Sequence, residues 1–443
     1  MVFLSSTYVL YYLLIQSIMR KDMFRKTTLK NGLRIITASQ RGTEAATVLI
    51  LVGTGSKYET KKTSGISHLV EHLVFKGTKK KPTPLEVIEP IDKIGGIWNA
   101  FTGEEYTGYF AKVAAPHVEM ALDWVSDIYL NPLLPKQEIK KEKRVIIEEI
   151  NMGYDLPTRY IEILWNKLLY GDQPAGWDIA GTKDTVAQMS RQDILSYIKS
   201  QYVASNTIIC LAGRIKEERL ILKVKKYFSS IRTTQTKTKP MVIERQSKPQ
   251  YLLHPKETDQ THLRLGVRGY NFFHPQRYAQ DLLGLILGGM KSSRLFVEIR
   301  EKLGMAYYVS TAVDASSDTG SLATQAGIDN KRVGKAITVI LKEYRKISQK
   351  KVSEIELRKA KDHIKGKMAL VLESSDALAS FYGIQELLEK KILTSNEIYD
   401  KINKVSASDI SRVARSIFRP ANLNLVLIGP FKDKDKFLKL LKL

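Results

Sequence analysis

The two halves of this 443-residue chain show the same order of secondary-structure signals. Each half begins with runs rich in β-branched residues, continues through helical patterns and closes on a short apolar strand. The closing strands are "NTIICLAG" (206–213) and "NLNLVLIGP" (422–430), and long charged helical patterns occupy residues 137–152 and 350–368. The repeat indicates an internal duplication of a unit of about 200 residues, which is an ordinary domain size.

The periodicity within each half predicts both strands and helices. Residues 33–52 contain two apolar runs around a polar turn, a pattern typical of a β-hairpin. A helix should follow, capped by Thr63 or Ser64 and ended by Gly77. Further strands are expected at residues 95–113, 261–270 and 306–313, and further helices at residues 116–129 and 278–290. We therefore expect an α+β fold of two homologous domains, each with a mixed or antiparallel sheet packed with helices.

The composition changes between the halves. The stretch "SSIRTTQTKTKP" (229–240) is rich in Ser, Thr and Lys and ends in proline, as linkers do. We expect a first domain at residues 23–230, a linker at 231–248 and a second domain at 249–443.

An apolar extension, residues 1–22, precedes the first domain. Its residues 1–19 include serine and threonine hydroxyls, no charge precedes the apolar run, and no small-residue cleavage site follows it, so a secretory signal fits poorly. Nineteen residues are barely enough to span a bilayer, and the basic flank would then keep the rest of the chain in the cytoplasm. A translation start at Met23 is the other alternative. We expect a cytoplasmic protein, with membrane contact through residues 1–19 left open.

The composition excludes or disfavours several classes of protein. Hydrophobic residues make up 43% of the chain and charged residues 26%, which is typical of a folded globular protein. The single cysteine, Cys210, excludes an intrachain disulfide and a cysteine-based zinc site. The net charge of +24 raises the alternative of a protein that binds nucleic acid or an anionic surface. The lysines alternate with glutamates on helical patterns, as on solvated helix faces, so we expect no nucleic-acid partner.

The stretch "SHLVEHLVFKGT" (67–78) contains two of the chain's seven histidines. His68 and His72 are four residues apart and share one face of a helix, and Glu71 leans toward the same side. Two imidazoles in this arrangement suit Zn²⁺, and a nearby carboxylate can accept a proton from water. Such a pair of histidines also arises by chance. A catalytic zinc site needs a third protein ligand as well.

The helical pattern "KQEIKKEKRVIIEEINMGYD" (136–155) offers that ligand. Its isoleucines mark the inward side of the helix, where Glu142 and Glu149 also fall and Glu148 does not. A carboxylate on an apolar face is unfavourable unless it is paired or metal-bound. Glu149 is therefore the candidate ligand, and Glu142 is a candidate to orient a histidine. The alternative is that both glutamates reach solvent or a lysine.

The second half serves as an internal control. When the two charged helices are aligned, Arg358 and Lys365 stand where the first half has Glu142 and Glu149, and the second half has no histidine pair in its corresponding helix. Only the first half carries this set of side chains.

These residues resemble a known family, the pitrilysin-type (inverted-zincin) metallopeptidases. The likeness is to its short two-domain subfamily, which includes the mitochondrial processing peptidase β subunit and bacterial relatives. It covers nearly all of residues 24–443 and rests first on the H-x-x-E-H order with a distant downstream glutamate. "GSKYE" (55–59), "GGIWNAFTGEEYTGYF" (95–110) and "LGGMKSSRLFVEIREKLGMAYYV" (287–309) also resemble family signatures.

The resemblance implies roles for further residues. Asn99, Ala100 and Phe101 would form a strand edge that pairs with the substrate backbone, which is β-augmentation. Arg300 and Tyr307 would contact the substrate from the opposite wall and donate hydrogen bonds to its carbonyl or oxyanion.

The resemblance also implies a mechanism. One Zn²⁺ per chain, held by His68, His72 and Glu149, would activate water, and Glu71 would move its proton to the leaving amine. The chain would be a zinc endopeptidase acting on short or unstructured peptides in a chamber enclosed by two chains. Because this chain carries both the zinc set and the Arg/Tyr pair, a homodimer is expected, with a heterodimer as the alternative. The alternative function is that of a non-catalytic structural subunit of the same family.

Overall fold

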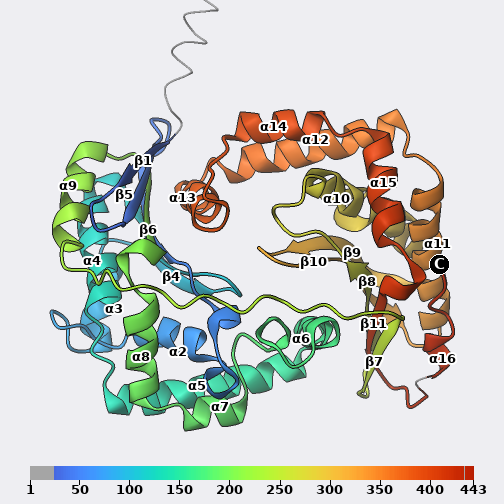
Figure 1. Ribbon diagram of the computed structural model, residues 1–443, viewed down its shortest axis with the longest axis horizontal. Coiled ribbons are helices and arrows are strands. Elements are labelled where there is room, and N and C mark those ends of the chain that lie inside the picture. The colour runs from blue at the N-terminus through green and yellow to red at the C-terminus, as the bar shows by residue number, and fades with distance from the viewer. Residues whose placement is uncertain (1–23, 434) are drawn as a thin grey trace, which may run out of the picture.

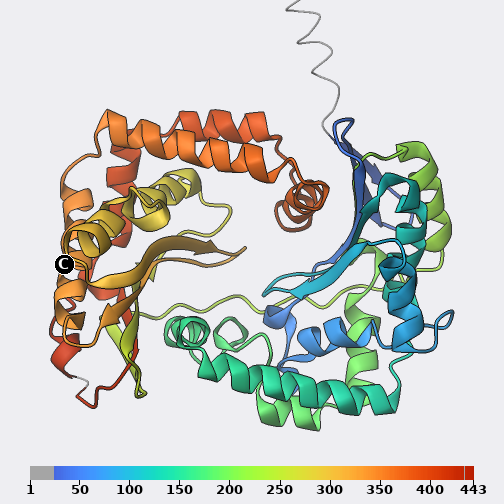
Figure 2. The same ribbon diagram turned by 180° about the vertical axis from the view of Figure 1, so that it is seen from behind.

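The computed structural model describes residues 24–433 and 435–443 (Figure 1). The expected extension at residues 1–22 lies outside these ranges. In the described ranges, no helix is long and apolar enough to cross a membrane. The two halves of the chain face one another across the molecule, each with its own sheet (Figures 1 and 2). The expected α+β fold is confirmed.

The first sheet has six strands in the order β1-β2-β6-β3-β5-β4. The strands are β1 (Arg25–Thr28), β2 (Arg34–Ser39), β3 (Ala45–Val52), β4 (Ile97–Thr102), β5 (Thr107–Ala114) and β6 (Thr207–Gly213). Strand β6 is parallel to β2, and the other pairs are antiparallel. The strand β4 lies at one edge of the sheet, so one side of it is open to a further strand.

The hairpin expected at residues 33–52 is wrong. Strands β2 and β3 do form there, but β6 lies between them and pairs with both. All seven residues of β6 are buried, so the centre of the sheet is the favourable position for this strand. A local pattern of two strands around a turn carries no information about a third strand that arrives about 160 residues later.

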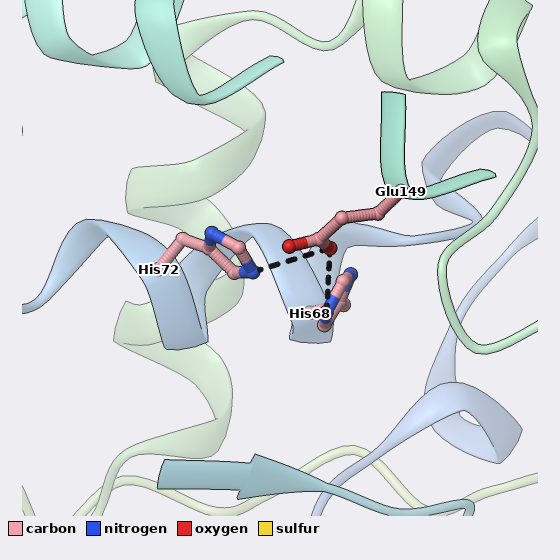
Figure 3. A group of neighbouring side chains, drawn as sticks. All are labelled: His68, His72 and Glu149. Atoms are coloured by element: carbon pink, nitrogen blue, oxygen red, sulfur yellow. Dashed lines mark ion pairs between the residues drawn. The ribbon is translucent and has the colours of Figure 1, made fainter. Parts of the chain in front are cut away.

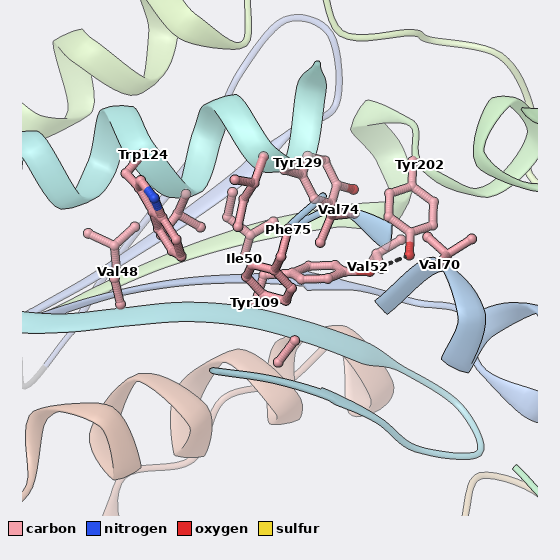
Figure 4. Close-up of a cluster of buried hydrophobic side chains, with 14 of the residues drawn as sticks. Val48, Ile50, Val52, Val70, Val74, Phe75, Tyr109, Trp124, Tyr129 and Tyr202 are labelled. Atoms are coloured by element: carbon pink, nitrogen blue, oxygen red, sulfur yellow. Dashed lines mark hydrogen bonds between the residues drawn. The ribbon is translucent and has the colours of Figure 1, made fainter. Parts of the chain in front are cut away.

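Helices cover one face of the first sheet and enclose its core. The core gathers Val48, Ile50 and Val52 of β3 with Trp124 and Tyr129 of the helix at residues 118–130 (Figure 4). The helical elements of this half are η1 (Ser56–Tyr58), η2 (Lys61–Thr63), α2 (Ile66–Leu73), α3 (Pro84–Asp92), η3 (Ala115–His117), α4 (Val118–Leu130), α5 (Lys136–Asp155), α6 (Pro157–Tyr170), η4 (Pro174–Gly176), α7 (Lys183–Gln188), α8 (Arg191–Gln201), η5 (Ala204–Asn206) and α9 (Glu217–Tyr227).

The second sheet has five strands in the order β7-β11-β8-β10-β9. They are β7 (Gln250–Pro255), β8 (Gln260–Arg268), β9 (Ala306–Ala315), β10 (Gly320–Asp329) and β11 (Leu423–Gly429). The helical elements of this half are α10 (Arg277–Gly284), η6 (Leu285–Gly289), η7 (Phe296–Lys302), α11 (Val333–Gln349), α12 (Glu354–Val371), α13 (Ser375–Ile384), η8 (Gln385–Glu389), α14 (Ser395–Asn403), α15 (Ala407–Ile417), η9 (Pro420–Asn422) and α16 (Asp435–Leu438); η6, η7 and η8 are π-helical.

One helix of each half packs against the sheet of the other half. Helix α13, from the second half, packs on the face of the first sheet that is turned toward the second half (Figures 1 and 2), where Leu378, Ala379 and Tyr382 meet Leu49 and Cys210. Helix α6, from the first half, packs on the second sheet in the same way. There Leu164 and Trp165 meet Ala323, Val426 and Ile428. This exchange means that each sheet is buried on both faces only when both halves are present.

Residues 231–249 contain no helix or strand and run as an extended segment between the halves (Figure 1). The segment also joins a buried polar junction between them. Lys57 of the first half lies 3.1 Å from Asp318 and donates a 2.6 Å hydrogen bond to Ser316, both in the second half. Glu105 lies 3.6 Å from the same ammonium, and Lys239 of the connecting segment pairs with Asp318. The division of the chain into separate domains stays a prediction.

Candidate metal centre

Helix α2 carries the histidine pair and begins without the expected hydroxyl cap. Its N-cap is Gly65, which has a φ of +92° and no side chain. The carboxylate of Glu59 instead accepts hydrogen bonds from the backbone N–H groups of Gly65 (2.7 Å) and Ser67 (2.9 Å). A carboxylate at a helix N-terminus satisfies unpaired donors and the helix dipole together. The predicted caps Thr63 and Ser64 are therefore wrong, and the helix ends at Leu73, before Gly77.

The structure brings His68, His72 and Glu149 together (Figure 3). One carboxylate oxygen of Glu149 lies 3.7 Å from Nε2 of His68 and 3.6 Å from Nε2 of His72. The two imidazole rings are 4.7 Å apart and nearly perpendicular. In the described ranges this is the one group of three such side chains close enough to hold a metal ion. Helices α2 and α5 supply it from one half.

Glu142 lies behind His72. One of its oxygens is 3.1 Å from Nδ1 of His72, and the other is 2.9 Å from the ammonium of Lys76. Burial would raise the pKa of the Glu142 carboxyl, but the hydrogen bonds from His72 and Lys76 outweigh it and lower this pKa. An ionised Glu142 accepts a hydrogen bond from the Nδ1–H group of His72, so Nε2 keeps its lone pair directed at the cluster.

The two histidines differ in their electrostatic surroundings. Burial, the neighbouring His72 and the charge of Arg159 lower the pKa of His68 to about 4. Burial also acts to lower the pKa of His72, but the carboxylates of Glu142 and Glu149 outweigh it and raise that pKa. His68 is therefore neutral at pH 7, as a metal ligand must be.

Glu71 faces the same space from α2. Its carboxylate accepts a hydrogen bond from the hydroxyl of Thr102, the last residue of β4. Burial raises the pKa of Glu71 above its ordinary value, although the Thr102 bond and the charge of His72 oppose the shift. A carboxylate with a raised pKa is a better proton acceptor than one free in water.

The expected substrate strand is the open edge of the first sheet. Asn99, Ala100 and Phe101 lie in β4, where Asn99 pairs with Phe110 of β5. The side chain of Asn99 accepts a hydrogen bond from the backbone N–H of Ala100. Trp98 and Ala100 face the core beneath α2, and Phe101 faces α13. The strand therefore runs beside the histidine helix, with its last residue in contact with Glu71.

Arg300 and Tyr307 lie in the second half, in η7 and β9. The guanidinium of Arg300 donates to the backbone carbonyl of Tyr307 and lies 5.7 Å from its ring. Tyr307 is 74% exposed. Within the described ranges neither side chain forms a hydrogen bond or ion pair with His68, His72 or Glu149. The structure pairs these two residues with each other and leaves them outside the histidine cluster.

Several residues around the cluster were not predicted from the sequence. Lys76 is four residues after His72, so a helix that reached Gly77 would have put both on one face, although α2 ends at Leu73. The hydroxyl of Thr102, the cap at Glu59 and the charge of Arg159 carry no comparable signal, because each depends on contacts between separate elements. In the second half, Arg358 and Lys365 do occur on a helix, α12, as the alignment of the halves expected.

Both halves of the chain match models of a known protein family. Residues 34–183 match the family described as insulinase, or peptidase family M16, and residues 188–364 match the peptidase M16 inactive domain. The uncharacterized zinc protease YmxG of Bacillus subtilis is 34% identical over 412 residues, which cover 92% of this chain and 98% of that protein. An uncharacterized zinc protease of Rickettsia felis is 31% identical over 411 residues, covering 93% and 98%.

Solved structures share the fold. The crystal structure of a protease from Helicobacter pylori superposes with a TM-score of 0.85 at 24% identity, covering 92% of this chain and 99% of that one. The peptidase M16 inactive domain from Pseudomonas fluorescens superposes with a TM-score of 0.84 at 15% identity, covering 93% and 99%. These likenesses show a common fold, and the sequence matches show the family. The chain belongs to peptidase family M16, in its short two-domain form.

Proposed function

We propose that this chain is a zinc-dependent endopeptidase that hydrolyses short or unstructured peptides. The observation that carries the proposal is the convergence of His68, His72 and Glu149 with Glu71 beside them. The names of the relatives, zinc proteases, support the same class. The second half supplies no such cluster among its described residues, so one zinc per chain is proposed.

The three side chains fit a zinc ion. Donor atoms around tetrahedral zinc, at about 2.0–2.1 Å from the metal, lie about 3.4 Å from one another. The two distances from Glu149 to the histidines, 3.7 and 3.6 Å, are close to this value. When bound there, zinc would supply Lewis-acid activation of water and of the peptide carbonyl.

Glu71 is the proposed general base and acid. Its carboxylate lies on the same face of α2 as the histidines and has a raised pKa. It would accept a proton from the attacking water and pass it to the leaving amine. Thr102 would keep this carboxylate turned toward β4, where the peptide is proposed to lie.

The peptide is proposed to bind by adding a strand to the open edge of β4 at Asn99, Ala100 and Phe101. The exposed Arg300 and Tyr307 are proposed to act on a substrate held by a second chain, in a chamber that two copies enclose. This arrangement gives a use to an arginine and a tyrosine that lie outside the cluster of their own chain. It also favours a homodimer, with a heterodimer as the alternative.

The test compares purified wild-type protein with the Glu71→Gln variant. Metal analysis should find one zinc per chain in both proteins, and only the wild type should cleave an unstructured fluorogenic peptide. o-Phenanthroline should abolish that cleavage, and added zinc should restore it. Equal activity in the two proteins would disprove the role of Glu71. A wild type that binds zinc but cleaves no peptide would support the non-catalytic subunit instead.

A further inference from the structure

Arg159 lies beside the cluster of His68, His72 and Glu149, and the proposed mechanism gives it no role. Gly153 follows Glu149 by four residues in α5, so both lie on one face of that helix, about 6 Å apart along its axis. The guanidinium of Arg159 lies over Gly153. A Cβ built on Gly153 would have Nε and Cζ of Arg159 at 3.7 and 3.8 Å as its nearest neighbours. The arginine therefore extends the face of α5 that carries Glu149.

The order of contacts along α5 places Arg159 at one end of the cluster. Glu142 contacts His72, and Glu149 contacts both histidines. The contacts along α5 therefore pass from His72 toward His68. Gly153, one turn after Glu149, lies further in that direction. A cation thus lies at the His68 end of the proposed zinc site.

The guanidinium of Arg159 is available to a ligand. Within the described ranges its side chain forms no hydrogen bond and has no carboxylate within 4.0 Å. The nearby carbonyls of Tyr154 and Asp155 at the end of α5 accept instead from Lys256 of the second half, at 3.0 and 3.2 Å. Arg159 is exposed, so an anion can approach it from solvent. Asp178 lies near enough for the charge of Arg159 to act on its pKa, but it does not pair with the guanidinium. A guanidinium that pairs with no carboxylate is suited to bidentate recognition of one.

We propose that Arg159 is a specificity-determining residue that binds a carboxylate of the peptide next to the scissile bond. This inference rests on the proposed peptidase function and adds a substrate class, which is acidic peptides. The carboxylate has two sources, an aspartate or glutamate side chain or the C-terminal carboxylate of a short peptide. A net charge of +24 would also draw acidic peptides toward the protein in preference to basic ones.

The test uses a matched set of fluorogenic peptides that differ at one position near the cleaved bond. Glu, Gln and Lys are placed there, and each peptide is made with a free or an amidated C-terminus. The protein variants are Arg159→Gln, Arg159→Glu and Arg159→Lys. The control is Lys167→Gln, an exposed lysine at the far end of the same helix, α6.

A charged hydrogen bond of about 1.5–3 kcal/mol corresponds to a change of roughly 10- to 100-fold. For the preferred acidic peptide, Arg159→Gln should lower kcat/KM by about this factor and leave the neutral peptide unchanged. Arg159→Glu should favour the Lys peptide, and Arg159→Lys should fall between wild type and Arg159→Gln because it keeps the charge without the planar fork. Lys167→Gln should match wild type. The peptide set shows which carboxylate, side-chain or terminal, carries the effect.

Binding measured in the Glu71→Gln background separates this inference from the peptidase proposal. Fluorescence anisotropy should show tighter binding of the acidic peptide than of the neutral one, and the added Arg159→Gln change should remove the difference. A wild type that cleaves no peptide would defeat the peptidase proposal, while the binding comparison would still decide the role of Arg159. An equal loss for acidic, neutral and basic peptides in Arg159→Gln would assign Arg159 to the structure of the α5–α6 corner and overturn the inference.

Discussion

Glu142 and His72 form a partly buried hydrogen bond of 3.1 Å on the side of the imidazole that faces away from the proposed zinc site. Lys76, at 2.9 Å from the other oxygen of Glu142, completes a short chain of alternating charges from α5 to α2. The pair links a group that would not touch metal to one that would. If Glu142 positions His72 as proposed, its replacement should act first on metal affinity.

Glu142→Gln should weaken zinc binding about 10- to 100-fold, the range found when a partner of a histidine ligand is removed. The amide can still accept a hydrogen bond, but it carries no charge to hold the proton on Nδ1. Competition with a fluorescent zinc chelator measures the affinity. The control is Glu148→Gln, an exposed carboxylate on the same helix, which should bind zinc like wild type. Equal affinities in all three proteins would contradict the orienting role.

Glu59 should give the metal-free protein a dependence of stability on pH. Burial raises the pKa of Glu59 from 4.5 to about 7, although the hydrogen bonds from Ser67 and Gly65 oppose the shift. The folded state therefore holds this proton between pH 4.5 and 7 where the unfolded state releases it, so the free energy of unfolding falls as the pH rises through that window. The contribution is about 3 kcal/mol at most.

Glu59→Gln cannot ionise and should remove this slope. Urea unfolding in EDTA at several pH values between 4.5 and 7.5 measures it, with the exposed Glu89→Gln as the control. A slope that is the same in wild type and Glu59→Gln would show that another group titrates.

Lys57→Met should destabilise the fold by about 3–5 kcal/mol. Lys57 is 1% exposed and its ammonium lies among Glu105, Asp318 and Ser316, so its loss leaves these two buried carboxylates to share the ammonium of Lys239 as their counter-charge. Lys61→Met is the matched control, because the Lys61 side chain is 78% exposed and pairs with the exposed Asp172, so it should cost less than about 1 kcal/mol. Denaturant unfolding compares the two. Equal stability of both variants would show that this junction contributes nothing to the fold.

Gly383→Ala tests the exchange of α13 onto the first sheet. A Cβ at Gly383 would lie 2.5 Å from Sγ of Cys210 and 2.7 Å from Cδ1 of Leu51. The overpacking should destabilise the protein by about 1–3 kcal/mol. Adding Cys210→Ala removes the sulfur and should recover part of the loss in a double-mutant cycle. Strict additivity of the two changes would indicate that α13 does not pack against β6 in solution.

The helices at residues 118–130, 136–155 and 354–371 and the buried strands β6 and β11 were predictable, because their signals repeat over a few residues. The same holds for the grouping of His68 with His72 and of Glu142 with Glu149. Helical spacing alone puts each pair on one face. The likeness of the two halves was also visible, as was the absence of a matching set of ligands in the second half.

The tertiary structure decided which of these faces meet. It placed β6 between β2 and β3, exchanged α6 and α13 between the sheets, capped α2 with Glu59 and set Arg159 over Gly153. The physical reason is the separation along the chain of the residues that come into contact. Spacing along one element follows from the geometry of its own hydrogen bonds, whereas each of these contacts is selected by the packing free energy of segments that the chain brings together only when the whole core closes.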